Sequence, residues 1–133
     1  MKKELNPLIA VVDDDDSVRE ATTALLRSNG CRVEAFDSAE AFLASPLAGA
    51  AACLLLDVAM PGMSGLELQR TMAAAGRTIP IVFITAHDNP AIRLQALGSG
   101  AVDVLPKPFG EAALLRAIKI ALAAGKAQAE EEE

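Results

Sequence analysis

The sequence predicts an α/β fold, a doubly wound, five-stranded parallel sheet with five helices in a three-layer α/β/α sandwich. Two observations carry this prediction. Five short apolar runs alternate with five segments of helical periodicity along the 133 residues, and the connections between them are short. Such alternation favours parallel strands joined by right-handed crossovers, which place helices on both faces of the sheet. Hydrophobic residues make up 52% of the chain and aromatic residues only 3%, so we expect one largely aliphatic core.

The first strand and helix are expected near the N-terminus. Residues 8–12 form a continuous apolar run, which is typical of an interior strand. Val18 and Leu25 lie about two helical turns apart, on the same face of the expected helix. Gly30 is a typical residue to end that helix.

The second strand has a different pattern. Residues 31–36 alternate between apolar and polar side chains, which indicates a strand with one wetter face at the edge of the sheet. The segment 37–45 is expected to form a short helix, with Ser38 as its N-cap and Glu40 near the start of its first turn.

The same alternation continues to residue 124. The remaining expected elements are strands at 52–57, 79–85 and 101–105 and helices at 64–76, 89–100 and 111–124. Pro90 just inside the fourth helix and Gly98 near its end fit the usual asymmetry of helix termini. Four adjacent glutamates without apolar periodicity end the chain, so we expect one domain over residues 1–125 and an acidic disordered tail over 126–133.

Charge and hydropathy exclude several functions. The net charge of −6 argues against nucleic-acid binding by this domain, which would need clustered Lys and Arg. No apolar run approaches the roughly 20 residues of a membrane span, and no secretion signal is visible, so we expect a cytoplasmic protein without a membrane partner. Cys31 and Cys53 lack a metal-binding spacing and are expected to be small buried hydrophobes.

Polar side chains follow four of the five expected strands. The run Asp13–Asp16 follows the first strand, Asp57 ends the third, Thr85 ends the fourth, and Lys107 lies just beyond the fifth. The carboxyl ends of parallel strands meet at one edge of a sheet, and this is where open α/β folds bind ligands. We therefore expect these side chains to form one site.

The residue types in this group are suited to phosphoryl transfer. Clustered carboxylates repel one another unless a cation or proton neutralises them, and oxygen ligands favour a hard cation such as Mg²⁺. A carboxylate beside such an ion can attack phosphorus, and Asp57 is the candidate nucleophile. Lys107 and Thr85 have the charge and the hydroxyl group that stabilise a transferred phosphoryl group.

The four adjacent aspartates are expected to divide into two pairs. Asp13 and Asp14 are the candidate cation ligands, although a solvated acidic loop at a helix start is the simpler alternative. Of Asp15 and Asp16, one is expected to cap the following helix and the other to face solvent.

These motifs resemble the receiver (CheY-like) domain of bacterial two-component response regulators. The resemblance covers residues 7–124 and is carried by the segments VVDDD, LLLDVAMPGMSG, IVFITAH and AVDVLPKPF. It implies a flavodoxin-like sheet with the strand order 2-1-3-4-5. The sequence around Asp57 and Lys107 is most similar to that of FixJ/NarL-type and NtrC-like receivers, which are attached to DNA-binding output domains.

The resemblance implies a role for each matching residue. Asp57 would be the phosphoacceptor, and Thr85 and Lys107 would contact the phosphoryl group. The Lys107–Pro108 bond matches a cis peptide of the family. The implied ligands of Mg²⁺, for which Mn²⁺ can substitute, are Asp13, Asp14, Asp57 and the backbone carbonyl of Ala59.

Two positions depart from the family pattern. Val104 stands where many members have an aromatic residue whose inward movement accompanies that of the threonine, so a different or smaller output movement is expected. Ala59 replaces a larger side chain, and in the family this position and that of His87 tune dephosphorylation.

The resemblance also implies partners. A sensor histidine kinase or a phosphotransfer protein would supply the phosphoryl group, and the domain would catalyse only its own modification and slow hydrolysis. Phosphorylation would alter the face built by the fourth helix, fifth strand and fifth helix, through which a homodimer is plausible. We expect the excised receiver of a transcription regulator, with a stand-alone or phosphorelay receiver as the alternative.

Two rival functions are weaker. A haloacid-dehalogenase-like phosphatase would use Asp13 as its nucleophile, but this function leaves Asp57 unused and lacks a final acidic motif after Lys107. A phosphorylation-independent pseudo-receiver is disfavoured by the complete set of site residues, although Val104 slightly favours it.

Overall fold

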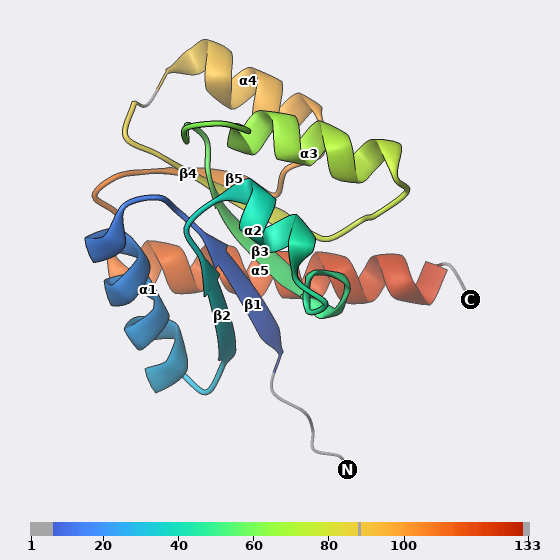
Figure 1. The fold of residues 1–133 in the computed structure, drawn as a ribbon. Coiled ribbons are helices and arrows are strands. Elements are labelled where there is room, and N and C mark those ends of the chain that lie inside the picture. Colours follow the sequence, from blue (N-terminus) through green and yellow to red (C-terminus); the bar gives the residue numbers. More distant parts are fainter. Residues whose placement is uncertain (1–6, 88, 132–133) are drawn as a thin grey trace.

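Five parallel strands form a single sheet in the order β2-β1-β3-β4-β5, as predicted (Figure 1). The computed structural model describes residues 7–87 and 89–131, with side chains to residue 125. The strands are β1 (Leu8–Val12), β2 (Arg32–Phe36), β3 (Cys53–Asp57), β4 (Ile81–Thr85) and β5 (Asp103–Pro106). Val12 pairs with Phe36 on one side and Leu56 on the other, so the carboxyl ends of three strands lie level at one edge.

Helices cover both faces of the sheet, which confirms the predicted three layers. The helices are α1 (Asp16–Ser28), α2 (Ala39–Ala44), the 3₁₀ turn η1 (Ala48–Ala50), α3 (Gly65–Ala74), α4 (Pro90–Gly98) and α5 (Glu111–Glu131). Figure 1 shows α3 and α4 together on one side of the sheet and α5 across the other.

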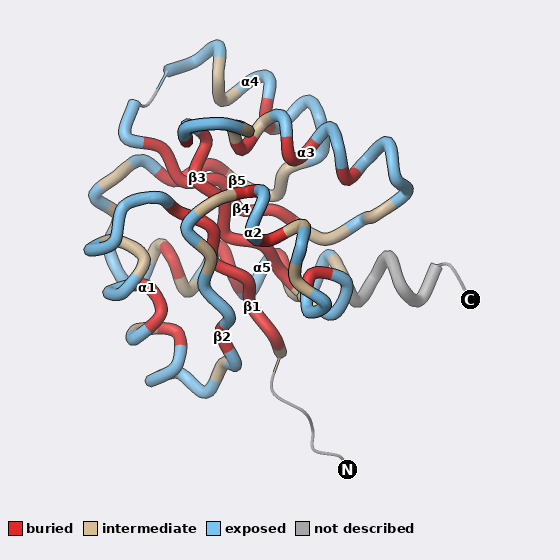
Figure 2. The backbone as a smooth tube through the Cα atoms, viewed as in Figure 1, coloured by how far each residue is buried: buried red, intermediate tan, exposed pale blue. Residues whose placement is uncertain are grey.

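The core consists of two apolar clusters, one on each face of the sheet. Successive strand residues point to opposite faces, so Ile9 and Val11 pack against α1 and α5, whereas Ala10 and Val12 pack against α2, α3 and α4. Because helices cover both faces, β1, β3 and β4 are buried along their whole length (Figure 2). At the edge of the sheet, β2 buries only Val33, in agreement with its predicted wetter face.

Polar caps start the helices where the sequence predicts. The Asp15 side chain accepts from the Val18 N–H at the start of α1, and Ser38 caps α2 in the same way. Ser64 and Glu67 form a reciprocal capping box at the start of α3. These caps fix where each loop of the carboxyl edge ends.

Some boundaries differ from the prediction. The strand β4 begins at Ile81 rather than at residue 79, because the proline at position 80 has no N–H to donate to the neighbouring strand. The helix α5 continues past Ala124 to Glu131, so residues 126–131 of the expected tail are helical, and 132 and 133 lie outside the described residues. The Ala, Lys, Gln and Glu residues there are strong helix formers.

The remaining fold expectations concern cysteines and membrane spans. Cys53 is buried, Cys31 is half-buried, and both are free thiols. Burial raises the pKa of Cys53 to about 12, so its thiol stays protonated and inert. Among residues 7–87 and 89–131, no helix is both long and apolar enough to cross a bilayer.

Candidate functional site at the carboxyl edge of the sheet

The predicted site residues lie at one edge of the sheet. Backbone hydrogen bonds of the sheet type continue for one residue past the ends of its strands and hold this edge. The Asp13 N–H donates to the Phe36 carbonyl over 3.1 Å and extends the β1–β2 pairing by one residue. The Lys107 N–H likewise donates to the Thr85 carbonyl over 2.7 Å, just past the pairing of β4 and β5. Asp57 is itself the last residue of β3. The backbone that carries these groups is therefore fixed by sheet hydrogen bonds.

Three carboxylates meet at this edge. Oxygen atoms of Asp13, Asp14 and Asp57 all lie within 4.8 Å of one another. Asp13 is 0% exposed and Asp57 is 5% exposed, whereas Asp14 faces solvent. Two buried acids and one exposed acid make an opening through which a small hard cation has access from solvent.

Lys107 is the cation that holds the two buried acids together. Its Nζ lies 3.1 Å from Asp13 Oδ2 and 3.4 Å from Asp57 Oδ2. Burial alone would lower the pKa of Lys107, but the two carboxylates outweigh burial and raise the pKa. The ammonium group therefore stays charged, yet one positive charge does not balance three carboxylates.

The surroundings of Asp57 disfavour its ionised form. Burial raises its pKa to about 7, and the nearby Asp13 carboxylate acts in the same direction. Lys107 and the Ala59 N–H, which donates to Asp57 Oδ1 over 3.3 Å, oppose this rise. Without further positive charge, a substantial fraction of Asp57 is thus protonated at neutral pH.

One buried oxygen tests whether the cluster fits a cation. Asp13 Oδ1 accepts the Asp15 N–H over 2.9 Å, but Oδ2 has no hydrogen-bond partner although it is fully buried. The ammonium of Lys107 is near enough to Oδ2 for an ion pair but lies outside hydrogen-bond geometry. Because a buried carboxylate oxygen without a donor is costly, the donor set suits an oxygen-seeking cation such as Mg²⁺.

The loop after β3 approaches the site so closely that it requires glycine. A Cβ atom on Gly65 would lie 2.1 Å from the Asp57 carbonyl oxygen, well inside contact distance. The Gly65 N–H donates to the Val58 carbonyl over 2.8 Å, and the Val58 N–H donates to Ile84 over 2.9 Å. These contacts hold both ends of the loop that carries Ala59, whose own side chain is exposed.

Thr85 lies at the same edge, but its hydroxyl group points to its own loop. The hydroxyl oxygen accepts the His87 N–H over 3.0 Å and donates to the His87 carbonyl over 3.1 Å. Thr85 is buried, whereas His87 is exposed. The structure therefore brings Thr85 to the site without placing its hydroxyl on the carboxylates.

The remaining predicted positions are also located. Val104 is buried in the cluster under α4 and packs with Ala96 and Phe83, so this aliphatic residue fills the position without an aromatic ring. The Lys107–Pro108 peptide bond is cis. Asp15 caps α1, and Asp16 is exposed and pairs with Arg19, so the expected division of the last two aspartates is as predicted.

The sequence did not predict a role for Arg19, which contacts the backbone of the site at Asp13. Its Nη1 donates to the Asp13 carbonyl over 2.8 Å while Nη2 donates to Asp16. The available signal was an arginine three residues after Asp16, on the face of α1 that returns toward the acidic loop. A second missed residue, Glu40, accepts the Met63 N–H on the loop after β3.

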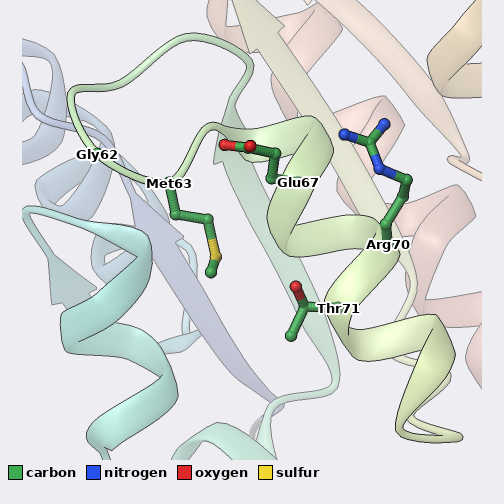
Figure 3. A pocket seen from close by; sticks show the side chains of 5 residues that line it. All are labelled: Gly62, Met63, Glu67, Arg70 and Thr71. Atoms are coloured by element: carbon green, nitrogen blue, oxygen red, sulfur yellow. The ribbon is translucent and has the colours of Figure 1, made fainter.

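A hollow lined by α3 and the loop before it does not contain the site. Its volume is about 490 Å³, and Figure 3 shows the five residues that line it, Gly62, Met63, Glu67, Arg70 and Thr71. None of them belongs to the carboxylate cluster. The chemistry of the edge is therefore in a small polar cluster rather than in the larger hollow.

A doubly wound domain with carboxylates, a hydroxyl group and a lysine at the carboxyl edge of its sheet defines a class, the receiver domains of signalling proteins. The chain belongs to the response regulator receiver domain family, whose model matches residues 9–119. Receiver domains of two-component response regulators are phosphorylated by histidine kinases and generally bind Mg²⁺.

Individual relatives agree with this assignment. Response regulator protein TmoT of Ectopseudomonas mendocina is 49% identical over 115 residues, which are 86% of this chain and 52% of the relative. Transcriptional regulatory protein FixJ of Azorhizobium caulinodans is 38% identical over 125 residues, covering 94% and 59%. The solved structure of response regulator StyR has a TM-score of 0.85 at 49% identity, covering 96% of this chain and 66% of that one. The chain spans about half the length of the curated relatives it matches.

Proposed function

We propose that Asp57 is the phosphoacceptor of this receiver, taking a phosphoryl group from a sensor histidine kinase or a phosphotransfer protein. The observation that carries the proposal is the contact of one lysine with two buried carboxylates, of which Asp57 ends a central strand. Asp57 is buried, its pKa is close to neutral pH, and it lies beside the positive charge of Lys107. Asp13, the other buried acid, is 0% exposed and accepts the Asp15 N–H over 2.9 Å. This hydrogen bond is shorter than the 3.3 Å one from Ala59 to Asp57.

The transfer step follows from these positions. A carboxylate oxygen of Asp57 forms a bond to phosphorus while the bond from phosphorus to the donor histidine nitrogen breaks, and that nitrogen keeps the electron pair. Lys107 stabilises the charge on a phosphoryl oxygen, since its ammonium already lies 3.4 Å from Asp57. The domain catalyses its own modification and subsequent hydrolysis, and the named relatives are regulators rather than enzymes.

The cation site of the proposal uses the carboxylate cluster. Asp13, Asp14 and Asp57 would hold Mg²⁺ or Mn²⁺ together with the Ala59 carbonyl. Asp13 Oδ2, which accepts no hydrogen bond and has the ion pair with Lys107, supports this assignment. When bound, such a cation supplies positive charge to the phosphoryl oxygens. The protein's part is to fix the three carboxylates and to leave the cluster open at Asp14.

The switching part of the proposal begins at Thr85. Its hydroxyl would leave His87 and donate to a phosphoryl oxygen on Asp57, which would move the loop that leads to α4. Val104 offers no aromatic ring to follow this movement, so the change would pass through the backbone of that loop. Ala59 and His87 would flank the phosphoryl group and set how readily water reaches it.

The output part of the proposal rests on exposed apolar residues and on the relatives. Leu94 on α4 is 74% exposed and Ile120 on α5 is 52% exposed, which supports a phosphorylation-dependent homodimer through the α4–β5–α5 face. Because relatives such as FixJ are named transcriptional regulators, we assign residues 1–125 as the receiver part of a longer transcription regulator. A stand-alone or phosphorelay receiver is the alternative, and both alternatives place the domain in the cytoplasm.

Intact mass spectrometry tests the central claim. Purified protein is incubated with phosphoramidate and Mg²⁺, beside Asp57→Asn and the control Asp16→Asn, which changes an exposed acid. We expect a gain of about 80 Da on wild type and on the control, and none on Asp57→Asn. Equal adducts on all three proteins, or no adduct on wild type, would refute the assignment.

A further inference from the structure

A side chain from α2 contacts the loop between β3 and α3 close to the start of α3. The Glu40 Oε2 atom accepts the Met63 N–H over 3.0 Å, and the two residues are 23 positions apart in the sequence. Figure 3 shows Gly62 and Met63 on the segment that enters α3, with the α2 ribbon beside it. The same hydrogen bond lowers the pKa of Glu40, so the acceptor is a carboxylate at neutral pH.

Gly62 provides a second, independent sign of this contact. A Cβ atom there would lie 2.7 Å from Glu40 Oε2, which is closer than real contacts allow. The backbone of Gly62 also has a φ of 73°, a conformation that glycine adopts without strain. The backbone therefore favours glycine here, and the Glu40 carboxylate occupies the space that a side chain at this position would take.

Glu40 projects from a helix that cannot easily shift. Ala39 and Phe42, on either side of it in α2, are fully buried. The Phe42 ring packs edge-to-face on Phe36, with ring centroids 5.5 Å apart, and Ser38 caps the helix. The backbone that carries Glu40 is therefore fixed, and its exposed carboxylate is held by the hydrogen bond from Met63.

The loop that Glu40 holds is the one that leaves Asp57. Its start is held by the Val58 hydrogen bond to β4 and its end by Gly65, so Met63 is the point where α2 fixes the part between. Ala59 lies on this loop, and its N–H contacts Asp57. A loop free at Met63 would let the Ala59 carbonyl leave the position needed to ligate a cation.

We infer that Glu40 is a positioning residue that presents the Ala59 carbonyl to the cation of the phosphorylation site. The inference rests on the proposed function of the carboxylate cluster. Glu40 acts through the Met63 backbone and through loop geometry, without touching the cation or the phosphoryl group. Removing its acceptor should weaken cation binding while leaving the core of the fold in place.

The test compares Glu40→Ala with Glu40→Gln. The alanine variant removes the acceptor, whereas the glutamine variant keeps a carbonyl oxygen at similar reach and loses only the charge. We measure Mg²⁺ affinity by isothermal titration calorimetry, exchange of the Met63 amide by NMR in EDTA, and urea unfolding. Glu34→Ala, which removes an exposed acid of β2, controls for the change in net charge.

The expected result is specific to the acceptor. Glu40→Ala should exchange the Met63 amide faster and bind Mg²⁺ about ten-fold more weakly, whereas Glu40→Gln and Glu34→Ala should stay close to wild type. Phosphorylation of Glu40→Ala by phosphoramidate should be slow at low Mg²⁺ and recover at saturating Mg²⁺. If Glu40→Ala does not fold, Glu40→Asp, which keeps the charge but shortens the reach, carries the same expectation.

The contrary outcomes separate the two proposals. If wild type binds Mg²⁺ and is phosphorylated but Glu40→Ala binds Mg²⁺ equally well, Glu40 is only a structural brace and the inference is wrong. If Glu40→Gln loses as much affinity as Glu40→Ala, the effect is one of charge, and the inference is again wrong. If wild type takes up neither the cation nor the phosphoryl group, the proposed function fails, and the inference fails with it.

Discussion

Replacing Asp57 by asparagine should stabilise the metal-free protein, and the gain should grow with pH. The structure buries this carboxylate beside Asp13, which raises its pKa from 3.8 to about 7. A group whose pKa is higher in the folded state contributes stability that is complete below its unfolded pKa. That contribution is lost as the pH rises through the folded value. Ionised Asp57 therefore works against folding at pH 8, and Asp57→Asn removes this penalty.

The magnitude follows from the two pKa values of Asp57. The pKa of Asp57 is 3.8 in the unfolded chain and about 7 in the folded protein. This difference lowers the free energy of unfolding by roughly 2.6 kcal/mol as the pH rises from about 5 to about 8. Solvent at the edge of the sheet screens the repulsion from Asp13, so we expect about half of this, roughly 1.3 kcal/mol. The asparagine amide keeps the shape of the carboxyl group and can donate to Asp13, which limits any loss of packing.

Urea unfolding in EDTA at the two pH values measures this difference. Wild type should lose about 1.3 kcal/mol relative to Asp57→Asn between about pH 5 and about pH 8, with equal m-values for both proteins. Glu34→Gln, a neutral substitution of an exposed acid on β2, should follow wild type. The reasoning is refuted if the difference between wild type and Asp57→Asn stays constant with pH or if wild type becomes the more stable protein at pH 8.

Three further predictions concern groups around the same edge. Lys107→Met leaves buried carboxylates without their cation and should lower the free energy of unfolding in EDTA at about pH 8 by roughly 1 to 3 kcal/mol; an unchanged urea midpoint would contradict the ion pairing. Gly65→Ala should destabilise by more than about 2 kcal/mol because its Cβ would overlap the Asp57 carbonyl, whereas Gly98→Ala, in open space within α4, should be neutral or stabilising by urea unfolding. Ser64→Ala removes the cap of α3 and should cost about 1 kcal/mol by the same assay, with no change in the pH dependence of stability.

The placement of the site could be predicted from the sequence because each polar residue directly follows an apolar run. Asp57 and Thr85 end strands that are buried throughout, so the sheet alone determines which edge they reach. The helix starts were equally predictable from Ser38 and Ser64, whose caps are local interactions. Contacts within about four residues and alternation along strands were sufficient for these features.

The side-chain contacts that cross between elements could not be predicted in this way. The bond from Met63 to Glu40 joins a loop to a helix 23 positions away, and no spacing rule relates them. The direction of the Thr85 hydroxyl depends on how the chain turns at His87, which the apolar pattern does not determine. The predicted end of α5 at residue 124 was wrong. The high helix propensity of the glutamates outweighs the repulsion among their charges, so the helix continues to Glu131.

The site therefore has two parts that differ in how they are held. Sheet hydrogen bonds fix the backbone of Asp13 and Lys107, so changes to these side chains alter electrostatics without moving the frame. The loop groups depend partly on side-chain contacts. The Thr85 hydroxyl makes two hydrogen bonds with the His87 backbone, and Glu40 adds one contact to the backbone hydrogen bonds at the two ends of the segment after Asp57. Each such contact contributes only about 1 kcal/mol net, which a new charge on Asp57 can outweigh. If Asp57 is the phosphoacceptor, as proposed, its phosphorylation should move these loops while the carboxylates and the lysine keep their positions.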